Sequence, residues 1–162
     1  MRALVASLTL LLAACGFQPM YAPIGGGPAI GPVEVTQIDG KAGHVLHTEL
    51  ERMLAVERSA GGAPAQLQIT LTEAVIPLGL RVDESATRAE LRLVANYVLT
   101  PPAGDGLIRG SVASVVNYDI PQAAFGEIAA QDDARERAAE TLAHRMRAEL
   151  ALRMAQARNT AN

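Results

Sequence analysis

Residues 89–118 read AELRLVANYVLTPPAGDGLIRGSVASVVNY. In the first half, every second residue from Leu91 to Leu99 is apolar or aromatic, with Arg92 and Asn96 among the residues between them. A period of two predicts a β-strand over 89–100 with one buried face. Residues 107–118 alternate in a similar way, and the Pro- and Gly-rich residues 101–106 predict a turn. The stretch therefore predicts an antiparallel hairpin.

The flanking sequence predicts two more strands and two helices. Residues 66–75 alternate Leu and Ile with Gln and Thr, which predicts a third strand, and 33–38 alternate more weakly and predict a first one. Residues 41–60 carry apolar side chains at helical spacing and end at Gly61-Gly62-Ala63-Pro64. Residues 125–157 are rich in Ala, Glu, Arg and Leu, which favour a long helix.

The order strand, helix, three strands, helix predicts an α+β fold. Each strand has one apolar face and each helix one apolar stripe, so the simplest closed arrangement has two helices packed on one face of a four-stranded, mostly antiparallel sheet. The opposite face is then polar and uncovered. It is expected to carry Gln68, Thr70, Thr72, Arg92, Asn96, Arg109, Ser111 and Asn117.

The N-terminus has the organisation of a secretory signal peptide. Met1-Arg2 is a short positive start, residues 3–12 are almost wholly apolar, and Ala13-Ala14 are small. The apolar run is too short to cross a bilayer, which takes about 20 residues as a helix. The next residue, Cys15, is the only cysteine of the chain. We therefore predict a signal peptide over 1–14 and lipid attachment at Cys15.

The rest of the chain is expected to form one domain behind a tether. Residues 15–32 are rich in Gly and Pro and predict a flexible connection from the lipidated cysteine, and residues 33–158 predict a single α+β domain. The formal net charge of −3 and an aromatic content of 3 % argue against nucleic-acid binding, because such proteins use a basic field and stacking platforms.

Catalytic and metal chemistry are not indicated. The chain has neither a nucleophile elbow nor a phosphate-binding loop, so we expect no enzyme and no cofactor. His44 and His47 lie three residues apart with Glu51 one turn further on, but no cluster of Cys or Asp accompanies them. We read them as surface residues of a helix and not as metal ligands.

Several motifs together resemble a known family. Leu12-Ala13-Ala14-Cys15 resembles the bacterial lipobox, and the following Gly16-Phe17-Gln18-Pro19-Met20-Tyr21 is similar to the mature start of the LPS-assembly lipoprotein LptE family, in its alphaproteobacterial form. The segments Thr87–Leu91, Ser114–Asp119 and Gln131–Ala139 agree with that family in order.

The resemblance implies a location and a function. Cys15 would carry acyl chains such as palmitate, and Gly16 after it is typical of lipoproteins sent to the outer membrane. The protein would be lipid-anchored there on the periplasmic side. Family members plug the large β-barrel LptD, help it to assemble and take part in lipopolysaccharide transport to the outer leaflet. Two helices on a four-stranded sheet is also the fold that the family implies.

Arg92 and Arg109 are the candidate contacts for lipopolysaccharide, whose phosphates and carboxylates attract basic side chains. We expect hairpin pairing to place them roughly opposite each other. The alternative interpretation is that both are ordinary exposed arginines paired with nearby acids. Arg81 and Arg88, in a predicted loop over 76–88, are weaker candidates. The family's lipid-contacting residues cannot be transferred to particular positions, because the strands match by pattern only.

Two other functions compete with this one. The chain could be a stand-alone periplasmic lipid- or ligand-binding lipoprotein, which would need a concave apolar pocket, whereas the sequence favours a compact alanine-rich core. It could also be a periplasmic enzyme, against which the missing catalytic motifs argue.

Overall fold

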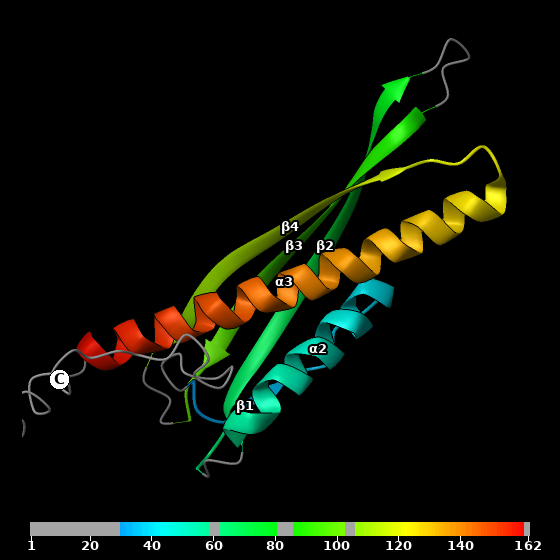
Figure 1. Cartoon of the computed structure of the whole chain (residues 1–162). Coiled ribbons are helices and arrows are strands. Elements are labelled where there is room, and N and C mark those ends of the chain that lie inside the picture. Colours follow the sequence, from blue (N-terminus) through cyan, green and yellow to red (C-terminus); the bar gives the residue numbers. More distant parts are fainter. Residues whose placement is uncertain (1–29, 59–61, 81–85, 103–105, 161–162) are drawn as a thin grey trace, which may run out of the picture.

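The computed structural model describes residues 30–58, 62–80, 86–102 and 106–160. They form two helices and four strands, with the connections between them. Their order is β1 (Val33–Val35), α2 (Lys41–Arg58), β2 (Ala65–Leu80), β3 (Ala86–Thr100), β4 (Ile108–Asp119) and α3 (Ala124–Thr160). Both helices lie on the same face of the sheet (Figure 1). The predicted fold class is confirmed.

The sheet is mixed and follows the order of the chain. Its strands are arranged β1-β2-β3-β4. β1 pairs with β2 in parallel, and the other two pairs are antiparallel. Leu67 lies opposite Leu99, and Leu91 opposite Val116, so the apolar residues of neighbouring strands share one face. This is the face that the two helices cover, and we call the opposite one the outer face.

The core lies between that sheet and the helices. α3 packs against β3, β4 and α2, whereas α2 packs against β1 and α3. Alanines at positions 134, 138, 139 and 143 of α3 are fully buried and belong to this core. Fully buried leucines surround them: Leu46, Leu50, Leu54, Leu67, Leu91, Leu93, Leu99, Leu142 and Leu150. Each buried leucine contributes on the order of 2 kcal/mol relative to an exposed one.

A tyrosine and a glycine on neighbouring strands fit together within this core. Tyr97 of β3 is directly opposite Gly110 of β4 and is only 2 % exposed. A Cβ atom at position 110 would overlap the phenol ring and hydroxyl of Tyr97. The ring therefore covers the glycine and supplies the packing that glycine lacks.

The predicted loop over 76–88 is wrong. β2 continues to Leu80 and β3 begins at Ala86, so the paired strands form an extended arm, which we define as 73–80 and 86–93. Pro77 and Gly79 are unfavourable inside a paired strand, but β1 pairs only with residues 65–67. Beyond that point β2 is an edge strand within the described part of the chain, and proline is tolerated in such a strand. The predicted loop residues 81–85 lie outside the described residues.

The folded part begins at residue 30, inside the predicted tether of residues 15–32. Ile30 is 2 % exposed, and the carbonyl of Pro32 accepts a hydrogen bond of 2.9 Å from the backbone of Ala65. Residues 30–32 therefore belong to the packed structure. The predicted signal peptide, Cys15 and the remaining tether fall in residues 1–29, outside the described part of the chain. None of the helices among the described residues has an apolar stretch long enough to cross a bilayer.

Candidate binding surface on the outer face of the sheet

The outer face carries the polar residues that the sequence placed there. Gln68, Thr70, Thr72, Arg92, Asn96, Arg109, Ser111 and Asn117 are all exposed, and the strand register aligns them in rows across the sheet. One row joins Gln68, Val98 and Arg109, and the next joins Thr70, Asn96 and Ser111. Neither helix packs on this side. The expectation of a polar, uncovered face is thus confirmed for these positions.

A shallow depression lies where these two rows meet. It has a volume of about 540 Å³ and is lined by Gln68, Thr70, Asn96, Val98, Arg109 and Ser111, with Tyr97 and Gly110. The amide and hydroxyl groups around Arg109 are neutral, and both donate and accept hydrogen bonds. One guanidinium among neutral hydrogen-bonding groups on a rigid sheet is suited to an oxyanion such as a phosphate or carboxylate.

Arg109 and Arg92 differ in their partners. Within the described residues Arg109 forms no ion pair. Arg92 donates to Glu90, two residues away on the same face of β3, at 2.8 Å. Arg88 likewise pairs with Asp119 at 3.0 Å. The alternative interpretation, ordinary arginines paired with acids, therefore describes Arg92 and Arg88, while Arg109 keeps its charge available. Arg81 lies outside the described residues.

The expected apposition of Arg92 and Arg109 is wrong. Arg92 lies opposite Val115, and Arg109 opposite Val98. The two arginines share the outer face but are offset by six residues along the strands, which corresponds to about 20 Å. They stand at different distances from the turn, so an antiparallel register cannot bring them together. A single small anion cannot contact both.

The outer face changes character toward the arm. Ile76 and Leu78 of β2 are 40 % and 38 % exposed, and Val115 of β4 is 45 % exposed. The expectation of a polar face did not include Ile76 and Leu78, whereas the alternation of residues 107–118 had placed Val115 on the face of Arg109. Ile76 and Leu78 were missed because the segment after Val75 was interpreted as a loop. The candidate surface is consequently polar around Arg109 and partly apolar at the arm.

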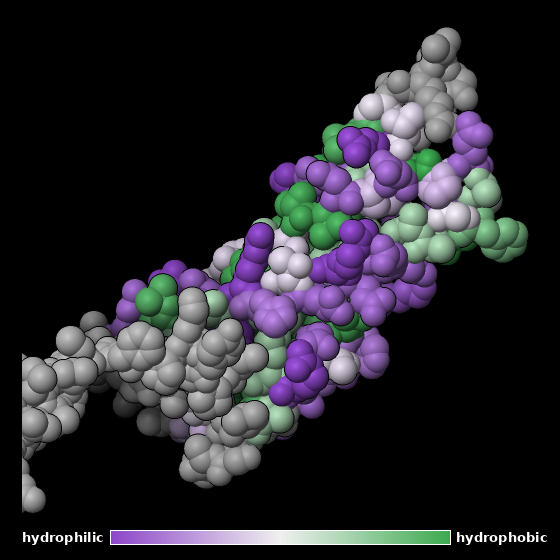
Figure 2. Space-filling view, in the orientation of Figure 1, coloured by the Kyte–Doolittle hydropathy of each residue, from purple (hydrophilic) through white to green (hydrophobic). Residues whose placement is uncertain are grey.

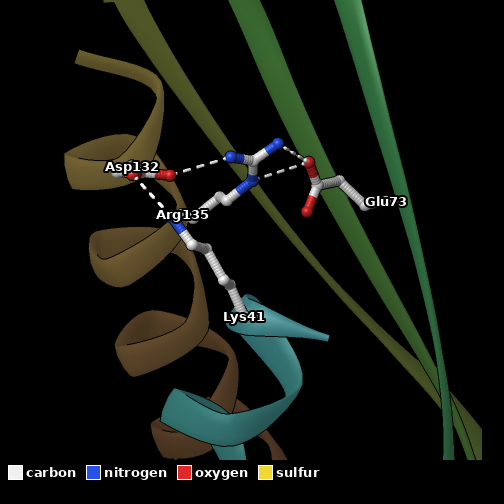
Figure 3. A network of polar contacts seen from close by, with 4 residues as sticks. All are labelled: Lys41, Glu73, Asp132 and Arg135. Atoms are coloured by element: carbon white, nitrogen blue, oxygen red, sulfur yellow. Dashed lines mark hydrogen bonds and ion pairs between the residues drawn. The ribbon is translucent and has the colours of Figure 1, made fainter. Parts of the chain in front are cut away.

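A charged network joins three elements on the helix side (Figure 3). Asp132 of α3 accepts from Lys41, the first residue of α2, at 2.8 Å and from Arg135 at 2.9 Å. Arg135 also donates to Glu73 of β2 at 2.8 Å. The hydrogen bond from Lys41, followed by that from Arg135, lowers the pKa of Asp132 below its ordinary value. The positive and negative charges balance, so the network fastens the elements together and does not offer a binding site for an ion.

The two histidines of α2 have separate surroundings. The Nε2 atom of His47 lies 3.3 Å from the carbonyl oxygen of Val35 in β1. His44 lines a groove beside Lys41, Asp132 and Arg135. Among the described residues, no three His, Cys, Asp or Glu side chains are grouped as metal ligands. His47 thus contributes to the contact between α2 and β1.

Comparisons with known proteins agree with this fold. No family model and no curated protein matches the sequence. A solved structure from Caulobacter crescentus CB15, described as a lipoprotein, is similar at 26 % identity with a TM-score of 0.63, covering 78 % of this chain and 93 % of the other. The rare lipoprotein B of Shewanella oneidensis is similar in fold at 15 % identity and a TM-score of 0.50, covering 73 % of this chain and 93 % of the other. The fold is therefore one that lipoproteins adopt.

Proposed function

We propose that this protein is a non-enzymatic outer-membrane lipoprotein that plugs an LptD-type β-barrel, helps it to assemble and takes part in lipopolysaccharide transport. The chain would be anchored by acyl groups on Cys15, with its domain on the periplasmic side. The resemblance of residues 12–21 to the start of LptE proteins motivates the proposal. The fold shared with a lipoprotein at 26 % identity supports it.

The proposed contact with the barrel rests on the polar composition of the outer face of the sheet. Its exposed side chains around Arg109 are short, neutral and capable of hydrogen bonding, and they are held on strands of 12 to 16 residues. The lumen of a large outer-membrane barrel is polar. A rigid polar face can therefore exchange its hydrogen bonds with water for hydrogen bonds to the barrel wall at little net cost.

Arg109 is the proposed contact for lipopolysaccharide. Its guanidinium has no acidic partner among the described residues, so an incoming phosphate need not displace one. A charge-assisted hydrogen bond is about twice as strong as a neutral one. Arg92 would have to give up Glu90 first, and for this reason we assign it a lesser role.

Site-specific photocrosslinking in cells tests the barrel contact. Photoreactive residues at Gln68 and Arg109 should form adducts with a large barrel protein. Thr141, exposed on α3, provides a matched position on the helix side. If Gln68 and Arg109 give no more barrel adduct than Thr141, the outer face is not the contact. If the full-length protein never co-purifies with a barrel, the proposed function itself is wrong.

Two further measurements separate anchoring from lipopolysaccharide binding. Intact-mass analysis of the mature protein should give an N-terminus at Cys15 carrying acyl chains, and an unmodified N-terminus would contradict the anchor. Arg109→Ala should weaken binding of purified lipopolysaccharide about tenfold, the effect of losing one charge-assisted bond, while Arg92→Ala should change it less. Equal effects of both substitutions would remove the special role of Arg109.

A further inference from the structure

The edge of β2 presents free backbone groups along the arm. The backbone N–H of Ala65 donates to Pro32, and the carbonyl of Leu67 accepts from Thr36, so odd-numbered residues of β2 direct their backbone groups toward the β1 side. β1 pairs only as far as Leu67. By the alternation of an antiparallel strand, Val75 and its odd-numbered neighbours continue to face that edge, where no other described strand pairs with them.

The opposite edge of the sheet is protected. The guanidinium of Arg145 in α3 donates to the backbone carbonyl of Ala113 in β4 at 2.7 Å. This charged side chain occupies an acceptor that a further strand would need. Inward-directed charges of this kind are a common protection of edge strands against pairing.

The β2 edge lacks such a charge. Residues 74–80 are uncharged, and the Glu73 carboxylate is held by Arg135 on the helix side. Val75 and Ile76 are each 40 % exposed, on the two different faces of the arm. Among the described residues of this edge, Pro77 offers some protection, because it removes one N–H, but its carbonyl remains free. An uncharged, partly apolar strand edge fits a partner strand of the same character.

We infer that this edge pairs with the same edge of a second copy of the chain. In an antiparallel arrangement centred on Val75, each Val75 exchanges two hydrogen bonds with its counterpart, and the N–H of each Glu73 reaches the carbonyl of Pro77 in the other copy. No two like charges are opposed, and the missing N–H of proline is not needed in the central bonds. The segment 72–78 thus complements itself.

The shape of the molecule permits this contact. The arm extends past the start of α2, and its tip diverges from the first turns of α3 (Figure 1), so neither helix covers the tip. The paired segment is short, and its area falls well below the roughly 1,200 Å² typical of stable complexes. The dimer is therefore transient and forms where the chain is concentrated. This inference does not depend on the proposed function.

Disulfide trapping in the full-length protein tests the pairing. Val75→Cys would place two thiols across the symmetry axis at a Cα separation of about 5.5 Å, which suits a disulfide. Val115→Cys on the outer face of β4, with a similar exposure of 45 %, is the matched control. The unsubstituted chain reports any background from Cys15. Mild oxidation should give a reducible dimer with Val75→Cys and little with Val115→Cys.

A second substitution distinguishes pairing from collision. Ile76→Lys in the Val75→Cys chain adds a positive charge to each arm close to the symmetry axis, and should reduce the dimer about tenfold. If its far-ultraviolet circular dichroism departs from that of the parent, Ala74→Lys replaces it. The inference fails if Val75→Cys gives no more dimer than Val115→Cys. It fails equally if the added lysine leaves the dimer yield unchanged.

Discussion

The two halves of the molecule differ in how completely the sheet is covered. Near β1 and the start of β2, both helices pack on the sheet and the buried leucines are concentrated. Toward the arm α3 continues alone, because α2 begins at Lys41, which contacts Asp132, while α3 begins eight residues earlier at Ala124. Phe125 and Ile128 lie on that extra length and are 89 % and 59 % exposed. Hydrophobic residues accordingly show at this end of the surface (Figure 2).

This difference in coverage implies that the residues that stabilise the fold and the exposed residues that can contact other molecules are concentrated in different halves. The lengths of 18 and 37 residues correspond to about 27 and 55 Å of helix, so the short helix covers less of the sheet than the long one. Exposed residues beyond α2, such as Phe125 and Ile128, contribute little to folding and remain free to meet other molecules. Substitutions in the two halves should therefore have very different effects on the free energy of unfolding.

The largest expected contrast is between two apolar truncations. Leu50→Ala in α2 removes a fully buried side chain and should destabilise the fold by about 2–5 kcal/mol. Val75→Ala in the arm, where the side chain is 40 % exposed, should cost less than about 1 kcal/mol. Urea unfolding of both variants measures these two losses in the free energy of unfolding. Similar losses would show that Val75 is packed as tightly as Leu50.

The tyrosine–glycine pair gives the next largest effect. Gly110→Val would force Tyr97 out of its place and should destabilise the protein by roughly 1–3 kcal/mol. The Tyr97 hydroxyl is buried and has no hydrogen-bond partner within the described residues, so Tyr97→Phe should be neutral or stabilising. Thermal unfolding of the two variants compares them. A clear loss in Tyr97→Phe would mean that the hydroxyl is bonded.

The burial of Tyr97 also leads to a prediction of how the stability of the fold changes at alkaline pH. Burial, together with the negative charge of Glu149, raises its pKa above the ordinary value. The folded state thus favours the neutral phenol, and this contribution is complete below the unfolded pKa of about 10 and is lost as pH rises through the folded pKa. Stability measured against pH should fall above about pH 10. The fall should be smaller in Tyr97→Phe.

A smaller effect is expected at the boundary between the halves. The lowered pKa of Asp132 means that its carboxylate favours the folded state above the ordinary carboxyl pKa of about 3.9, and that this contribution disappears as pH falls through the lower, folded value. Asp132→Asn should make stability less dependent on pH in the acid range, as followed by urea midpoints. Asp133, exposed on α3, provides the control as Asp133→Asn. An equal change in both variants would argue against the network.

The smallest effect belongs to the start of α3. Ile128→Ser should alter the free energy of unfolding by less than about 0.5 kcal/mol, because the side chain is already mostly in water. Ala138→Ser, at a fully buried position on the same helix, should cost more, since it buries a hydroxyl. Denaturant unfolding ranks the two. The reverse order would mean that α3 packs differently from the arrangement in Figure 1.

The sequence predicted both helices and the strands β2, β3 and β4 because their helical and period-two patterns are long, whereas the three-residue β1 followed from a weaker alternation. The alternation in 89–100 placed Leu91 and Arg92 on opposite faces correctly, since one buried face fixes the register of a strand. The arm was missed because Pro77 and Gly79 are local indications of a loop, whereas the tolerance of proline depends on where β1 stops. That is a property of the tertiary structure.

The candidate site was predictable in composition but not in arrangement. Arg109 and its neutral neighbours follow from the alternation of the strands. The availability of its charge, and the pairing of Arg92 with Glu90, depend on side-chain conformations that no spacing reveals. The network of Lys41, Asp132, Arg135 and Glu73 joins residues up to 91 positions apart, and nothing in the local sequence indicates it.

The bond from Arg145 to the Ala113 carbonyl also limits how far an assembly can grow. A sheet with two unprotected edges can add molecule after molecule into a fibril, a danger for any protein crowded on one surface. Because Arg145 occupies the Ala113 carbonyl at the β4 edge, we expect association through the β2 edge to stop at a closed pair. Removing this single side chain, as in Arg145→Ala, should thus be judged by turbidity and fibre formation as well as by folding.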